Sequence, residues 1–221
     1  MRTLDQLLRA AADPSQPLVT YYDMATGERV ELSTTTTANW VAKTSNFLVD
    51  ELDVEPGARV RIGLPSHWLT MVWILSAWNV GAAIVDHDAA IGVSGPELRA
   101  DEEHRLAASL RPLGGRFAEP PAGFVDLGAE VPGHGDHFVP LDPPAPETLA
   151  VDLGGVRRTH ADVLASASPV RDRLVVVPGA LTRDVDLLAG ACLGGGSLVV
   201  VASATSEQMA RVAQQEGGIP A

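Results

Sequence analysis

The apolar run from Leu69 to Val85 constrains the fold of this chain more than any other feature. It is 17 residues long and is interrupted by Ser76 and Asn79, whereas a helix that crosses a bilayer needs about 20 apolar residues. A buried helix that ends near Gly81, followed by a short buried strand, fits the pattern better than a membrane span. Because Arg59 to Leu64 has the composition of a strand, the order strand, helix, strand predicts a right-handed parallel crossover. The expected fold class is α/β.

Helix and strand patterns alternate along the rest of the chain as well. A polar residue that can cap a helix precedes four of the predicted helices, and these residues are Ser33, Ser66, Thr159 and Thr182. The first predicted helix covers Thr3 to Ala12. The helix after Ser33 runs to about Leu52, the helix after Ser66 ends near Gly81, the helix after Thr159 runs to about Ala167, and the helix after Thr182 ends before Gly194. The predicted strands are Leu18 to Tyr22 and Arg29 to Leu32, which form a hairpin, then Arg59 to Leu64, Ala82 to Val85, Thr148 to Leu153, Arg173 to Val177 and Leu198 to Val201. Gly194 to Gly196 lies between a helix and a strand, which is typical of a helix end rather than of a phosphate-binding loop.

Eight prolines lie between Pro112 and Pro146. Proline fixes φ and lacks an N–H donor, so this segment is expected to be an extended surface excursion rather than the interior of a sheet. We therefore expect one α/β domain over residues 1–221, with an amino-terminal lobe (1–111), a Pro-rich excursion (112–146) and a carboxy-terminal lobe (147–221). Because 75 residues are few for an independent core, the second lobe should pack on the first.

Composition excludes several classes of function. The net charge of −12 and the absence of any Lys/Arg run argue against a nucleic-acid partner. The single cysteine, Cys192, cannot form an internal disulfide, and the residues after Met1 lack the pattern of a signal peptide. A cytoplasmic location is therefore expected.

Several short motifs resemble the amino-terminal region of the adenylate-forming (AMP-binding) enzymes, the superfamily that includes acyl-CoA synthetases. They occur in the family's order and are Glu31 to Ser33, Asn39 to Ala42, Val54 to Val60, Leu64 to Trp68 and Gly81 to Val85, with a further match over Thr148 to Val201. The resemblance implies mostly parallel sheets flanked by helices. For an intact enzyme it also implies acid–thiol ligase chemistry that uses ATP.

The phosphate loop of that superfamily is missing from this chain. The family's loop is a Ser/Thr/Gly-rich run that ends in Lys-Gly-Val, two variable residues and Thr-His, and its backbone N–H groups and lysine hold phosphate. Gly155 to His160 resembles the end of that motif, but Gly154 stands in place of the lysine and Leu149 to Leu153 joins on directly. The family's aromatic-Gly-x-Thr-Glu motif, ribose-binding Asp and mobile-domain Lys are also absent from these 221 residues. The resemblance thus implies a truncated, non-catalytic relative, a pseudoenzyme.

Two groups of residues are candidates for ligand contacts. Arg157, Arg158, Thr159 and His160 are the remnant of the phosphate loop, and arginine can bind phosphate through two hydrogen bonds, although a basic pair before a helix is more commonly a solvated flank. Asp86, His87 and Asp88 follow a predicted parallel strand, where α/β sheets place their ligands. Adjacent side chains point apart and cannot all bind one metal ion, so no metal ligand is assigned.

Other clusters have simpler structural interpretations. His134 and His137 lie three residues apart in the Pro-rich excursion, but no cysteine lies nearby to complete a zinc site. The neighbours Ser66–His67 and Thr159–His160 pair a hydroxyl with an imidazole, yet neither has the nucleophile-elbow pattern of a hydrolase. Lys43, the only lysine among 16 basic residues, lies within a predicted helix with no phosphate-loop character.

We therefore expect a ligand-binding, regulatory or partner-binding protein with no catalytic residue of its own. No cofactor is assigned, although weak binding of a nucleotide such as ATP or AMP is compatible with the remnant. The expected partner is another protein or a second copy of the chain. Two alternatives remain open: a split adenylate-forming enzyme completed by another chain, and an unrelated metal- or ligand-dependent activity at the loop of Asp86 to Asp88.

Overall fold

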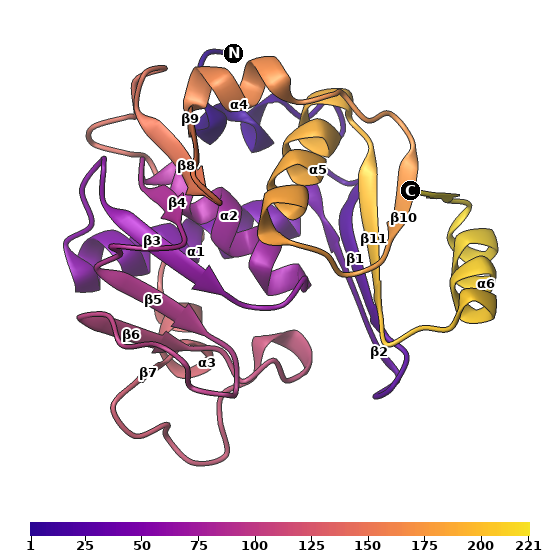
Figure 1. The fold of residues 1–221 in the computed structure, drawn as a ribbon, viewed down its shortest axis with the longest axis horizontal. Coiled ribbons are helices and arrows are strands. Elements are labelled where there is room, and N and C mark those ends of the chain that lie inside the picture. The colour runs from indigo at the N-terminus through magenta and orange to yellow at the C-terminus, as the bar shows by residue number, and fades with distance from the viewer.

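The computed structural model describes residues 1–221, which form two β-sheets with helices between and around them (Figure 1). The first sheet has five strands in the order β12-β10-β11-β1-β2, and the second has seven in the order β7-β6-β5-β3-β4-β8-β9. The strands are β1 (Pro17–Asp23), β2 (Glu28–Ser33), β3 (Arg59–Gly63), β4 (Ala83–Val85), β5 (Ile91–Ser94), β6 (His104–Ala107), β7 (Val125–Asp126), β8 (Leu149–Leu153), β9 (Val156–Thr159), β10 (Arg173–Val176), β11 (Ser197–Ala202) and β12 (Ile219–Pro220). Within each sheet, neighbouring strands are parallel except for the hairpins β1–β2 and β8–β9. The mostly parallel α/β fold predicted from the sequence is therefore confirmed.

The α-helices are α1 (Thr34–Leu52), α2 (Trp68–Asn79), α3 (Leu127–Glu130), α4 (His160–Ser166), α5 (Leu181–Gly194) and α6 (Ser206–Glu216). Helix α2 lies at the centre of the molecule, where it contacts α1, α5 and strands of both sheets, while α6 covers the outer face of the first sheet (Figure 1). All residues of α2 from Trp68 to Trp78 are buried. No helix combines the length and the apolar character that a membrane span would require.

The apolar run from Leu69 to Val85 forms most of the helix and the second strand of the crossover β3-α2-β4. Strands β3 and β4 pair in parallel, with Val60 beside Ile84, and α2 returns the chain between them. The three tryptophans of α2 are at most 2% exposed and belong to a cluster of 43 buried residues that extends across both sheets. Burying a large apolar side chain stabilises a fold by about 1.5–3 kcal/mol, so this helix is a major contributor to the core.

Each sheet takes strands from both sides of the Pro-rich excursion. In the first sheet β1 pairs with β11, and in the second sheet β4 pairs with β8. The two sheets therefore do not coincide with the expected lobes at 1–111 and 147–221. The reason is that β1 and β2 complete a sheet whose other strands come from the last 50 residues of the chain, rather than pairing with β3 to β6.

The Pro-rich excursion is largely irregular but is not only a surface segment. It contains two short 3₁₀-helices (Pro112–Gly114 and Val131–Gly133), the edge strand β7 and the single turn α3. Leu127 and Val131 are buried in the main core. Lys43 on α1 donates hydrogen bonds to the carbonyl oxygens of Pro132 (3.0 Å) and His134 (2.6 Å), which explains the role of the only lysine.

Some predicted helix ends differ in the structure. Ser33 caps α1 and Thr159 caps α4 as expected, and Gly195 ends α5 with a positive φ. By contrast, α2 is capped by the imidazole of His67 rather than by Ser66, and α5 follows Ala180 without any side-chain cap at Thr182. The segment predicted as one helix over Thr3 to Ala12 forms two 3₁₀ turns, Leu4–Gln6 and Leu8–Ala10. The sequence patterns assigned no element to β5, β6, β9, α6 or β12.

Candidate functional site

The hairpin β8–β9 stands where the phosphate loop was expected. Leu153 pairs with Val156, so only Gly154 and Gly155 form the turn, and both have positive φ (59° and 75°). Two residues in this left-handed conformation are the preferred connection of a tight antiparallel hairpin, and glycine adopts it without strain. A closed turn of two glycines therefore stands in the place of the long phosphate-binding loop.

The loop of Asp86 to Asp88 lies directly beside this turn. Strand β4 pairs with β8 so that Val85 is next to Asp152, and the chain then continues into Asp86 at the end of the hairpin. The carboxylate of Asp86 accepts a hydrogen bond from the N–H of Gly154 (2.7 Å) and lies 2.5 Å from Nδ1 of His87. These two contacts lower the pKa of Asp86, and the carboxylate of Asp86 raises the pKa of His87. Two of the candidate groups from the sequence therefore meet at one edge of the second sheet.

Asp152 is the centre of this cluster. Its side chain is only 7% exposed, and its Oδ2 lies 3.6 Å from Arg59, 3.9 Å from Nε2 of His87 and 3.9 Å from Nε of Arg157. Arg59 also donates hydrogen bonds to the backbone carbonyls of His87 and Asp88. Sequence reasoning missed Asp152 and Arg59. A charged residue inside an otherwise apolar strand is a signal that could have found Asp152, because buried carboxylates are rare unless paired.

The other members of the phosphate-loop remnant point elsewhere. Arg158 forms an ion pair with Asp186 on α5 at 2.6 Å, and Thr159 caps α4 in a reciprocal capping box with Asp162. His160 is fully buried, its Nδ1 accepts a hydrogen bond from the N–H of Leu4 (3.1 Å), and burial lowers its pKa to about 4. Of the four remnant residues, only Arg157 joins the cluster around Asp152.

This cluster combines charges of both signs. The carboxylates of Asp86 and Asp152 face Arg59, Arg157 and His87, whereas Asp88 takes part through its backbone carbonyl. No serine, threonine or cysteine side chain takes part in these contacts. Its clearest physical effect is to hold the two-glycine turn against the end of β4.

In the structure, the hydroxyl groups of the two hydroxyl–imidazole pairs donate hydrogen bonds to carboxylates rather than to the neighbouring imidazoles. Ser66 donates a hydrogen bond to the buried carboxylate of Asp184 (2.7 Å) and accepts one from Gly179 (3.0 Å), while Nδ1 of His67 accepts from the N–H of Leu69. Burial lowers the pKa of His67 to about 4 and raises the pKa of Asp184. Ser66 therefore joins the loop after β3 to the start of α5, and its proton is directed away from His67.

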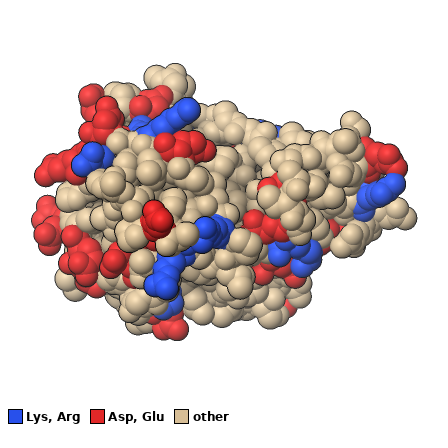
Figure 2. Space-filling view, turned by 90° about the horizontal axis from the view of Figure 1, so that it is seen from below, with Lys and Arg blue, Asp and Glu red and all other residues tan.

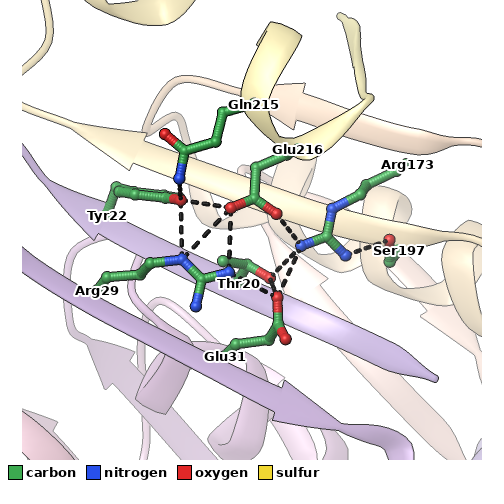
Figure 3. A network of polar contacts seen from close by, with 8 residues as sticks. All are labelled: Thr20, Tyr22, Arg29, Glu31, Arg173, Ser197, Gln215 and Glu216. Atoms are coloured by element: carbon green, nitrogen blue, oxygen red, sulfur yellow. Dashed lines mark hydrogen bonds and ion pairs between the residues drawn. The ribbon is translucent and has the colours of Figure 1, made fainter. Parts of the chain in front are cut away.

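A second polar network lies on the outer face of the first sheet, beneath the end of α6 (Figure 3). Its members are Thr20, Tyr22, Arg29, Glu31, Arg173, Ser197, Gln215 and Glu216. Glu216 contacts Tyr22, Arg29 (3.1 Å) and Arg173 (2.5 Å), and its side chain is 7% exposed. Burial alone raises its pKa, but the hydrogen bonds from these partners together hold the pKa of Glu216 below its ordinary value. The network fixes α6 to the sheet, and its residues are too widely spaced in the sequence to be grouped from it.

Comparison with known proteins places this geometry in context. No family model matches the chain. The chain is similar to a TIGR03089 family protein of Mycobacterium tuberculosis, with 39% identity over 215 residues that cover 90% of this chain and 88% of the relative.

Similar solved structures include acyl-CoA synthetases. They include the Brucella canis acyl-CoA synthetase (TM-score 0.76, 16% identity, 98% of this chain and 46% of that chain). The N-terminal domain of FACL13 from Mycobacterium tuberculosis has a TM-score of 0.72 at 14% identity, with 98% of this chain and 61% of that chain covered. Acetoacetyl-CoA synthetase from Streptomyces lividans has a TM-score of 0.76 at 17% identity, and the match covers 98% of this chain and 41% of the synthetase. The chain thus spans less than two thirds of these structures, and its fold is that of their amino-terminal part.

Proposed function

The chain belongs to the TIGR03089 family, and we propose that it is a non-catalytic relative of the acyl-CoA synthetases that acts by binding another molecule. The observation that carries this proposal is the turn of Gly154 and Gly155, which leaves no loop to surround a triphosphate. The rest of the amino-terminal fold is retained around that turn. A fold that persists without its phosphate loop is consistent with selection for binding rather than for adenylation.

Electrostatics at the hairpin supports the same conclusion. The N–H of Gly154, the group that could donate to a phosphate oxygen, already donates to Asp86. A phosphate at this turn would also approach the carboxylate of Asp152, and like charges at short range repel by about 1 kcal/mol or more even in water. Arg157 is the more exposed of the two arginines of the cluster, and it already faces Asp152. We therefore propose that ATP and AMP bind only weakly here and that the physiological partner is another protein or a second copy of the chain.

ATP–pyrophosphate exchange tests the loss of adenylation. The purified chain should give no exchange above a protein-free blank with a panel of short, long and aromatic carboxylates. Thermal unfolding in the presence of ATP–Mg, AMP, CoA and a non-hydrolysable acyl-adenylate analogue tests the loss of binding, because a ligand at 100 times its Kd stabilises by about 2.7 kcal/mol. Exchange by the chain alone would overturn the proposal. A shift with ATP that disappears in Arg157→Gln, but not in the control Arg171→Gln, would show that the remnant still binds phosphate.

A split enzyme is the competing function, and it is favoured by the observation that the chain spans only 46% of the Brucella canis enzyme. In that case a second chain would supply the missing aromatic-Gly-x-Thr-Glu motif and the catalytic lysine. Affinity purification of the tagged chain from its native cells, followed by the exchange assay on the isolated complex, separates the two. Exchange by the complex would establish the split enzyme, whereas a complex without exchange supports a binding role.

A further inference from the structure

A cavity of about 670 Å³ lies between the end of α1 and the segment 116–130. It is at the β7 edge of the second sheet, opposite the edge that carries the β8–β9 hairpin. Its apolar lining is formed mainly by Phe47, Leu52, Phe117, Phe124 and Val125. This volume is within the range of sites for small organic ligands, which are typically about 300–1,000 Å³ and largely apolar.

Hydrogen bonds and close packing fix the walls of this cavity. The carboxylate of Asp126 accepts hydrogen bonds from the N–H groups of Phe117 (2.9 Å) and Gly128 (3.0 Å), so it ties the wall at 116–118 to the start of α3. Gly128 packs directly on the neighbouring segment, since a Cβ atom there would lie 2.6 Å from the backbone of Arg116. Lys43 holds the segment that follows α3 against α1. The cavity is therefore preformed rather than a gap between loose loops.

The charges at the mouth of the cavity favour a cation. Glu51 and Glu130 line it and are exposed, and neither forms an ion pair within the chain. Glu51 lies in the last turn of α1, where the free carbonyl groups of a helix add negative potential. Arg116 is the single basic residue of the lining. Acidic side chains also gather toward one end of the molecular face in Figure 2, with a smaller basic group near its middle.

We propose that this cavity binds a small organic cation with an apolar or aromatic body and a terminal ammonium group. The body would fill the apolar space beside Phe117 and Phe124, and the ammonium would lie near Glu51 and Glu130. The inference goes beyond the binding role proposed above and does not depend on the hairpin. ATP–pyrophosphate exchange by the chain would overturn the proposed function but not this inference, and a lack of amine binding would overturn this inference but not the proposed function.

Titrations of the ¹⁵N-labelled chain with three probes of similar shape test this proposal. The probes are 2-phenylethylamine (cation), 2-phenylethanol (neutral) and 3-phenylpropionate (anion), followed in amide NMR spectra. The amine should give saturable shifts confined to residues around the cavity and should bind about tenfold more tightly than the alcohol and the acid, as expected for two weak ion pairs acting together. Equal binding of the alcohol, preferential binding of the acid, or no saturable shift with the amine would each overturn the proposal.

Charge variants at the mouth identify the source of the selectivity. Glu51→Gln with Glu130→Gln should remove most of the preference for the amine and leave the affinity for the alcohol unchanged. Arg116→Gln should strengthen amine binding, whereas an anion site would lose its ligand in this variant. Glu207→Gln, which removes an exposed carboxylate on α6, is the matched control and should bind the amine like the parent protein. Amine binding that is unchanged in the double variant would refute the assignment of these two carboxylates.

Discussion

The Glu216→Gln substitution tests how strongly the network beneath α6 holds this helix. The change keeps the size of the side chain but removes the charge that Arg29 and Arg173 share. Gln can still accept a hydrogen bond through one oxygen, so the variant isolates the electrostatic part of the network. We expect α6 to loosen because its last turn has no other charged contact with the sheet.

The magnitude follows from the burial of the partners. Hydrogen bonds to charged groups contribute about 1.5–3 kcal/mol each when shielded from water. The side chain of Arg173 is 16% exposed and should give a bond of that strength, whereas Arg29 is 41% exposed and its pair is worth at most about 1 kcal/mol. Glu31 still contacts both arginines and offsets part of the loss. We expect the free energy of unfolding to fall by about 2–3 kcal/mol, which in a chain of this size lowers Tm by roughly 4–12 °C.

Calorimetry measures the global effect, and amide hydrogen exchange measures the local opening of α6. The control is Glu207→Gln, because Glu207 and its partner Arg211 are 76% and 73% exposed and should contribute less than about 0.5 kcal/mol. The reasoning from burial is refuted if the free energy of unfolding of Glu216→Gln is within about 0.5 kcal/mol of that of the parent protein and the amide hydrogens of α6 exchange at the same rate in both.

Three further predictions concern the buried histidines, the hairpin turn and the only lysine. Burial lowers the pKa of His67 and of His160 to about 4, so between pH 6.5 and 4 the unfolded chain binds protons that the folded chain does not. As the pH is lowered through this window, the free energy of unfolding should decrease by about 3 kcal/mol per histidine. In urea titrations, His160→Gln should lose about half of this pH dependence. A slope that is flat over this window would contradict it. Gly155→Ala should cost about 1–2 kcal/mol in thermal unfolding because its φ is +75°, whereas Gly133→Ala, in open space at an ordinary φ, should be within about 0.5 kcal/mol of the parent. Lys43→Met removes two hydrogen bonds to backbone carbonyls and should speed limited proteolysis of the Pro-rich excursion, with equal cleavage rates as the result that would refute this role.

The parts of the fold that depend on neighbouring residues could be predicted from the sequence. Ser33 directly precedes α1 and can reach its free N–H groups, and the apolar run of α2 has the length of a buried crossover helix. Caps that depend on distant residues could not be predicted. Ser66 and His67 are both able to cap α2, and His67 takes that role because Ser66 bonds to Asp184, 118 residues away.

The candidate site was predictable only in part for a similar reason. The loop of Asp86 to Asp88 was expected at a strand end, and Arg157 was expected near the lost phosphate loop. Their meeting around Asp152 depends on the register of β4 against β8, which no local pattern encodes. The different roles of Arg157 and Arg158 could not be predicted either. Side chains alternate along β9, so the two neighbouring arginines point to opposite faces, and only Arg157 joins the cluster around Asp152.

The pairing of β1 with β11 has a consequence for how the chain folds as it is synthesised. Val19 lies beside Leu198 in the first sheet, so about nine tenths of the 221 residues must be synthesised before β1 acquires this neighbour. Until then the β1–β2 hairpin presents an unpaired strand edge, and an isolated hairpin has marginal stability in water. Long-range parallel pairing of this kind folds slowly and leaves apolar strands exposed to aggregation. We therefore expect formation of the first sheet to be the slow step when this protein refolds.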